Sequence, residues 1–328
     1  MQPDPDREAR AGQPSPVILD PLVQRLLDAS AAPPFLHELE PEAARQALRE
    51  SQADRIDDFD VDATFHTAPV GPTGLVGFWV FRPTGVGGRP PTVLYVHGGR
   101  WMLGDGQTHA WLISELVREA GVAAIVPEYS RTPESRYPVA LEECYALLTW
   151  AVGQAESLGL DTDRLAVAGD CAGATLATAL TLLARARGGP ELRAQLLYYP
   201  LTDARCDSPS QRLFATGYHL TREAVRSYWR QYVVDPQQRD EPTAVPLRAS
   251  TAALAGLPPA LVVTAEADVT RDEAEEYADL LLRAGVAATA ARFQGTVHDF
   301  VSLTALRNSP STRAAVRLGG RFLRAHLR

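Results

Sequence analysis

The chain has 328 residues, 45% of them hydrophobic, and a formal net charge of −8. That length suits one large α/β domain with a smaller accessory element. The acidic balance, without a basic stripe, argues against nucleic acid and against anionic membranes as partners. All 32 basic residues are arginine, so Schiff-base chemistry on a lysine is excluded.

Cysteine content and the N-terminal sequence bear on location. The three cysteines, Cys144, Cys171 and Cys206, are few and odd in number, which fits a reducing compartment. Residues 1–16 are charged and proline-rich, which predicts disorder and gives no sign of a signal peptide. No run approaches the roughly 18 apolar residues of a membrane span. We therefore expect a cytoplasmic protein without membrane partners.

Two helices are expected first, at 17–31 and 40–53, and neither belongs to an α/β alternation. The pattern then alternates, which predicts a mostly parallel sheet flanked by helices. Strands are expected at 56–70, 75–82, 91–97, 122–127, 165–168, 196–199, 260–265 and 287–293. Helices are expected between and after them at 111–120, 139–158, 175–187, 272–284 and 311–326.

The alternation breaks after residue 202 and resumes at 257, with one helix expected at 221–233. The predicted organisation therefore has four segments. They are an N-terminal extension with cap helices (1–55), the first part of the core (56–202), a cap insertion (203–256) and the second part of the core (257–328).

One stretch, Val167-Ala-Gly-Asp-Cys-Ala-Gly-Ala174, joins an expected strand to an expected helix. Gly169 and Gly173 stand two residues on either side of Cys171. This is the strand–elbow–helix pattern that presents a nucleophile on a sharp turn, where small neighbours let the chain bend. A buried structural cysteine is the alternative interpretation.

A second loop, His97-Gly98-Gly99, directly follows an expected strand. Consecutive glycines let backbone N–H groups approach a ligand oxygen closely. The N–H groups of Gly98 and Gly99, with that of Ala172, are therefore candidate donors to an oxyanion. The alternative is a tight turn without a catalytic role.

An acid and a base follow in the chain order that suits a nucleophile elbow. Asp268 lies just past one expected strand and His298 just past the next. Open parallel sheets build their sites at the carboxyl ends of strands. Asp272 is the nearest rival to Asp268 as the acid.

The chain resembles the hormone-sensitive-lipase-type carboxylesterases of the α/β-hydrolase superfamily from about residue 60 to its end. The resemblance rests on motifs that include HGGRWMLGD at 97–105, DRLAVAGDCAGA at 163–174 and GTVHDF at 295–300. It implies an α/β-hydrolase fold with a helical cap. It further implies a triad of Cys171, Asp268 and His298, and an oxyanion hole from Gly98, Gly99 and Ala172.

Three departures from the family pattern lie at the expected site. Cys171 replaces the family serine, Arg100 replaces the third glycine of the HGGG loop, and Asp299 replaces the glycine after the family histidine. A thiolate gives a thioester, which is reactive toward amines, thiols and carbanions as well as water. Cysteine therefore permits hydrolysis and also suits acyl transfer.

The expected function is that of a carboxylic-ester hydrolase-like enzyme of the EC 3.1.1 type. It uses a Cys–His–Asp triad on a small ester, thioester or lactone, by hydrolysis or acyl transfer through a thioester intermediate. Two alternatives stay open. One is a non-hydrolytic step of secondary metabolism, elimination or cyclisation, run by the His/Asp pair. The other is a degenerate homologue that only binds a ligand.

Further expectations concern the partners of the site. A small-molecule substrate would contact Arg100, Trp101, Tyr199 and His219. Neither HExxH nor CxxC spacing occurs, so no metal is expected. The sequence also lacks a phosphate-binding glycine loop after a strand, so no nucleotide cofactor is expected. The resemblance allows for a homodimer formed through 286–327.

Overall fold

The computed structural model describes residues 17–53, 60–85 and 87–328. The disorder expected for 1–16, the segment boundary at 55/56 and the start of the strand expected at 56–70 lie outside the described residues. No helix in the described ranges is both long and apolar enough to cross a membrane.

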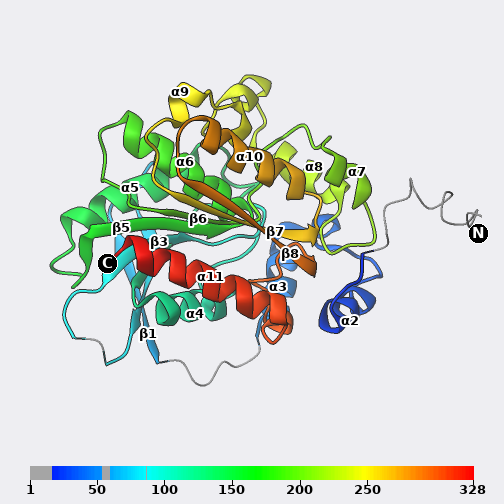
Figure 1. Cartoon of the computed structure of the whole chain (residues 1–328), viewed down its shortest axis with the longest axis horizontal. Coiled ribbons are helices and arrows are strands. Elements are labelled where there is room, and N and C mark those ends of the chain that lie inside the picture. The colour runs from blue at the N-terminus through cyan, green and yellow to red at the C-terminus, as the bar shows by residue number, and fades with distance from the viewer. Residues whose placement is uncertain (1–16, 54–59, 86) are drawn as a thin grey trace, which may run out of the picture.

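An eight-stranded sheet, in the order β1-β2-β4-β3-β5-β6-β7-β8, forms the centre of the molecule (Figure 1). The β1–β2 and β2–β4 pairings are antiparallel, and the other five pairings are parallel. The strands are β1 (Val61–Ala68), β2 (Val76–Pro83), β3 (Pro91–Val96), β4 (Ala123–Glu128), β5 (Asp161–Asp170), β6 (Gln195–Tyr198), β7 (Ala260–Ala267) and β8 (Ala288–Val297). The expected mostly parallel α/β fold is confirmed.

Helices cover both faces of the sheet. In Figure 1, α4 and α11 lie on one face, and α5, α6 and α10 lie on the other. These helices are α4 (Ala110–Ala120), α5 (Val139–Gly153), α6 (Ala172–Ala186), α10 (Arg271–Arg283) and α11 (Pro310–His326). With both faces covered, the central strands are apolar runs: Val93 to Val96 of β3 are 1% exposed or less.

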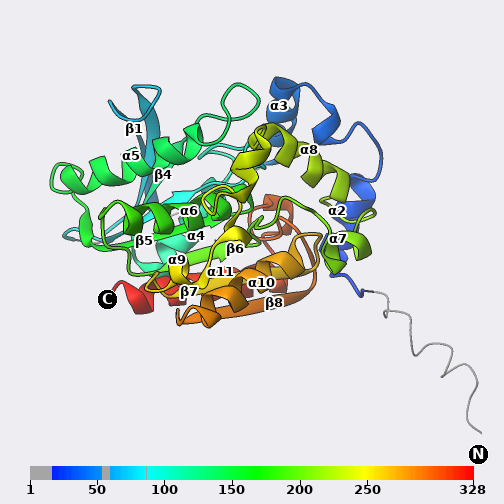
Figure 2. The same cartoon turned by 90° about the horizontal axis from the view of Figure 1, so that it is seen from above.

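The remaining helices come from an N-terminal and a later part of the chain, and most of them gather at one end of the sheet (Figures 1 and 2). The N-terminal ones are α2 (Pro21–Ala29), the 3₁₀ turn η1 (Leu36–Glu38) and α3 (Pro41–Ser51). The later ones are α7 (Pro209–Leu213), α8 (Arg222–Tyr232), η2 (Pro236–Asp240), η3 (Pro246–Arg248) and α9 (Thr251–Leu254); a last 3₁₀ turn, η4 (Thr304–Leu306), follows β8. Helix α8 contacts η1, which joins the two groups, whereas α9 and η3 pack against α10. The sequence pattern did not predict α7.

One arginine attaches α3 to the loops beside the sheet. The Arg45 Nε–H donates to the Met102 carbonyl (2.9 Å), and Nη2 donates to the Thr132 carbonyl (2.9 Å). Both terminal nitrogens also bond the Glu134 carboxylate, at 2.8 and 2.6 Å. The Arg45 side chain is 8% exposed, so its removal would leave two buried carbonyls without a donor.

We predict that Arg45→Ala lowers the free energy of unfolding by about 2 kcal/mol, because buried carbonyls lose their partner. Urea unfolding followed by tryptophan fluorescence measures this. Arg49→Ala on the same helix is the matched control: Arg49 pairs with Glu42 at the surface, and its loss should cost about 0.5 kcal/mol or less. Equal losses in the two variants would contradict the anchoring role.

Candidate active site

Cys171 lies on a sharp turn between β5 and α6. Its backbone has φ 52° and ψ −123°, a left-handed conformation that is costly for a residue with a side chain. A Cβ at Gly169 would lie 2.5 Å from the Gly173 carbonyl carbon, and a Cβ at Gly173 would lie 2.0 Å from the Val96 oxygen. Only glycine fits these two positions, which explains why both flank the cysteine. The structure thus places Cys171 at an elbow of the expected kind.

Asp268 and His298 meet at the ends of β7 and β8. The distance from His298 Nδ1 to Asp268 Oδ2 is 2.7 Å, and both side chains are fully buried. Asp268 also accepts the Thr270 N–H (2.9 Å), which fixes the orientation of its carboxylate. The rival Asp272 instead accepts the Ser210 N–H (2.8 Å). The geometry therefore selects Asp268 as the histidine partner.

Cys171, His298 and Asp299 converge. One ligand atom of each residue lies within 4.8 Å of the others, and Cys171 and His298 are 0% exposed. Nε2 of His298 has no hydrogen-bond partner among the described residues, so it is free to exchange a proton with a reacting group. Burial alone would lower the pKa of His298, but the carboxylate of Asp268, with a further contribution from that of Asp299, raises it well above the usual value.

The free N–H groups of the glycine loop differ from those that the sequence indicated. The Gly98 N–H, one of the predicted oxyanion donors, donates to Asp170 Oδ1 (3.0 Å), so it is already occupied in this structure. The N–H groups of Gly99, Arg100 and Ala172 take part in no hydrogen bond among the described residues. Ala172 begins α6, where the first N–H groups of a helix have no internal partner.

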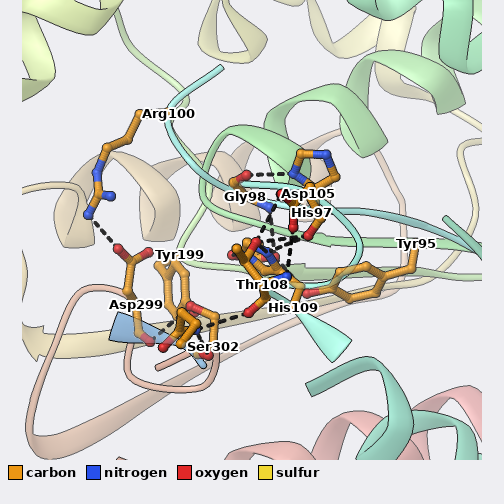
Figure 3. A network of polar contacts seen from close by, with 12 residues as sticks. Tyr95, His97, Gly98, Arg100, Asp105, Thr108, His109, Tyr199, Asp299 and Ser302 are labelled. Carbon is orange, nitrogen blue, oxygen red and sulfur yellow. Dashed lines mark hydrogen bonds and ion pairs between the residues drawn. The ribbon is translucent and has the colours of Figure 1, made fainter. Parts of the chain in front are cut away.

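The carboxylate of Asp170 holds this loop in place, a role that the sequence analysis missed. Asp170 Oδ1 also accepts the Tyr95 hydroxyl (2.6 Å), and His109 Nε2 lies 3.4 Å from Oδ2 (Figure 3). Burial opposes the charged form of His109, but the Asp170 carboxylate raises its pKa. The sequence signal for this role was an aspartate directly before the elbow cysteine. A carboxylate buried at that place must find nearby hydrogen-bond donors.

His97, the first residue of the loop, is a structural residue. Its ring stacks on Tyr129 with centroids 4.3 Å apart, and Nδ1 bonds the Gly98 carbonyl (2.8 Å). Burial lowers the pKa of His97 to about 3, so the ring is neutral near pH 7.

Arg100 and Asp299, two of the three departures from the family pattern, form an ion pair. Nη2 of Arg100 donates to Asp299 Oδ2, and the two side chains are 6% and 9% exposed (Figure 3). His219 precedes α8 in the chain, and its Nε2 lies 3.4 Å from the same oxygen, Oδ2 of Asp299. Burial would raise the pKa of Asp299, but the Arg100 guanidinium holds it well below its usual range.

The other three residues expected to contact a substrate lie in two different places. The Tyr199 ring lies beside His298, with centroids 4.7 Å apart, so Tyr199 and His219 are both at the site. The Trp101 ring is 1% exposed and stacks on Tyr232 (4.2 Å) next to Trp229. The structure therefore places Trp101 between the glycine loop and α8.

One cluster at this site has the spacing of metal ligands. Cys171, His298 and Asp299 are the only group of that spacing in the described part of the chain. The Arg100 guanidinium already neutralises Asp299, so a metal cation would have to displace it.

Comparison with known proteins agrees with the fold and the site. Residues 93–302 match a family described as alpha/beta hydrolase fold. The chain is 35% identical to an ethyl acetate hydrolase from Pseudomonas putida, over 82% of this chain and 85% of that protein. It is 36% identical to the carboxylic ester hydrolase LipN from Mycobacterium tuberculosis, over 81% and 71%.

Solved structures give the same result. A thermostable esterase from Pseudomonas putida superimposes with a TM-score of 0.92 at 38% identity, covering 96% of this chain and 99% of that one. A carboxyl esterase from Tuber melanosporum has a TM-score of 0.86 at 32% identity, covering 94% and 100%. With an eight-stranded sheet, an elbow after β5 and a family match over most of its core, this chain belongs to the α/β-hydrolase family.

Proposed function

We propose that this protein is a carboxylic-ester hydrolase that acts on a small ester, thioester or lactone through a thioester on Cys171. The observation that carries the proposal is the convergence of Cys171 with His298, whose other ring nitrogen is bonded by Asp268 at 2.7 Å. The relatives named above support it, since each is described as an esterase or ester hydrolase.

Attack by the Cys171 thiolate on the carbonyl carbon of the substrate would form a bond between that carbon and Sγ. It would also place a negative charge on the carbonyl oxygen. The free N–H groups of Gly99 and Ala172, with that of Arg100 in place of Gly98, are the candidate donors to this oxyanion. Collapse would expel the alkoxide, which takes the proton from His298 Nε2 as it leaves.

Hydrolysis of the thioester would complete the cycle. His298, now neutral, takes a proton from water as the water attacks the thioester carbonyl. The C–S bond then breaks, which returns the thiolate and releases the carboxylic acid. Asp268 holds the ring and stabilises the imidazolium in both halves.

Cys171 is the one cysteine placed for this chemistry. All three cysteines are free and buried, but burial raises the pKa of the Cys144 and Cys206 thiols above their ordinary value. Cys171 is the N-cap residue of α6, where the helix N-terminus favours an anion.

We predict that incubation with p-nitrophenyl esters and acyl thioesters gives an acyl adduct on the wild-type protein, because the thioester is an intermediate. Intact-mass spectrometry detects the adduct. Cys171→Ala should show none, and Cys144→Ala should behave as wild type. An adduct that persists in Cys171→Ala would exclude Cys171 as the nucleophile. Absence of both an adduct and product release in the wild type would favour the non-hydrolytic or the ligand-binding alternative. Product release at equal rates in wild type and Cys171→Ala would also exclude Cys171 as the nucleophile.

We also predict that His298→Ala lowers kcat/KM at least ~100-fold, because the proton donor and acceptor is lost. Steady-state release of p-nitrophenol measures the effect. His66→Ala, on the exposed face of β1, should leave the rate unchanged. A loss of less than tenfold in His298→Ala would exclude the proposed role of the histidine.

A further inference from the structure

Two carboxylates face the two ring nitrogens of His298. Asp268 Oδ2 lies 2.7 Å from Nδ1, and Asp299 Oδ1 lies 3.5 Å from Nε2. An imidazolium carries a proton on each nitrogen, so it donates to Asp268 and places its second N–H at ion-pair distance from Asp299. A neutral ring that donates to Asp268 instead turns the Nε2 lone pair toward Asp299. The Nε2 lone pair and the carboxylate of Asp299 repel each other, so the arrangement favours the protonated ring.

Arg100 keeps Asp299 in this position. The guanidinium binds Oδ2 of Asp299, while Oδ1 is directed at His298. A buried carboxylate without a cation would be strongly destabilising, so the two residues depend on each other. Both stand in left-handed backbone, with φ 59° for Arg100 and 65° for Asp299. The pair is held at two positions where the backbone would favour glycine.

The protonation state of the histidine matters differently for the two possible nucleophiles. A serine hydroxyl must give its proton to a bare Nε2 as it attacks. A cysteine thiolate has already lost its proton and needs Nε2–H as the donor to the leaving group. A site that holds the imidazolium therefore suits cysteine and opposes serine.

We propose that Asp299, held by Arg100, is a positioning residue that keeps His298 in the imidazolium form and makes this site selective for cysteine at position 171. The kinetic consequence rests on the function proposed above, but the state of the ring does not.

Several other groups also face the His298 ring. Cys171 and Tyr199 approach it from the ends of β5 and β6, and Asp268 from the end of β7. His219, from the segment before α8, reaches it only through Asp299. A test must hold these groups constant while Arg100 and Asp299 change.

The first test is the titration of His298 by ¹H–¹⁵N NMR in Cys171→Ala protein, where the thiol makes no contribution. The signal is assigned by its loss in His298→Gln. Adding Asp299→Asn should reduce the proton affinity of the ring about tenfold or more, because a carboxylate is lost while the Arg100 cation stays. Adding Arg100→Gly should not reduce the affinity. The pair Arg100→Gly and Asp299→Gly should fall between the two single changes.

This order of effects distinguishes an electrostatic role from a structural one, because loss of packing alone would lower the proton affinity of the ring whichever partner is removed. Glu142→Gln, which removes one carboxylate of the surface pair with Arg187, is the control and should leave the titration unchanged. An unchanged His298 titration in Asp299→Asn overturns the proposal. Circular dichroism confirms that each variant is folded, and the paired glycine variant serves if Asp299→Asn is not.

The second test exchanges the nucleophile. Cys171→Ser alone should hydrolyse p-nitrophenyl acetate poorly, and Cys171→Ser with Arg100→Gly and Asp299→Gly should be at least about tenfold faster, because Nε2 becomes a bare acceptor. Equal rates in the two serine variants overturn the proposed selectivity. If the wild type forms no acyl adduct but the NMR order holds, the thioester mechanism fails and the role of Asp299 in ring protonation stands.

Discussion

The close approach of α6 to β3 is the constraint on which the rest of this site depends. The backbone of Gly173 passes so near the carbonyl oxygens of Val96 and His97 that no Cβ fits between them. The turn before it must therefore be sharp, and Cys171 takes a backbone conformation that few non-glycine residues adopt. Cys171, the start of α6 and the glycine loop after β3 are brought together by this one contact.

A buried carboxylate then links the elbow to the glycine loop. Asp170, one residue before the cysteine, accepts the Gly98 N–H and the Tyr95 hydroxyl and lies beside His109. Because each partner comes from a different place in the chain, the loop cannot shift without leaving a buried charge unsatisfied. The same bond occupies the Gly98 N–H, so the free N–H groups of the loop begin one residue later.

The helices at the end of the sheet are attached to the same loops. Arg45 binds the carbonyls of Met102 and Thr132, and Gln52 donates to the Thr108 and Ser302 carbonyls. Trp101 stacks on α8 from the other side. Cys171 and His298 are themselves 0% exposed, and in such a surrounding of low dielectric buried charge pairs such as Arg100–Asp299 interact strongly.

By itself the sequence determined the alternation of strands and helices, the elbow at Cys171 and the chain order of acid and base. Those features depend on local patterns: apolar runs, glycine at fixed offsets and polar residues after strands. Only the tertiary structure decided which aspartate holds His298, that Gly98 is occupied by Asp170, and that Arg100 pairs with Asp299. Arg100 and Asp299 stand 199 positions apart. No local pattern links two residues so distant, because their contact exists only once the sheet places the two loops at the same edge.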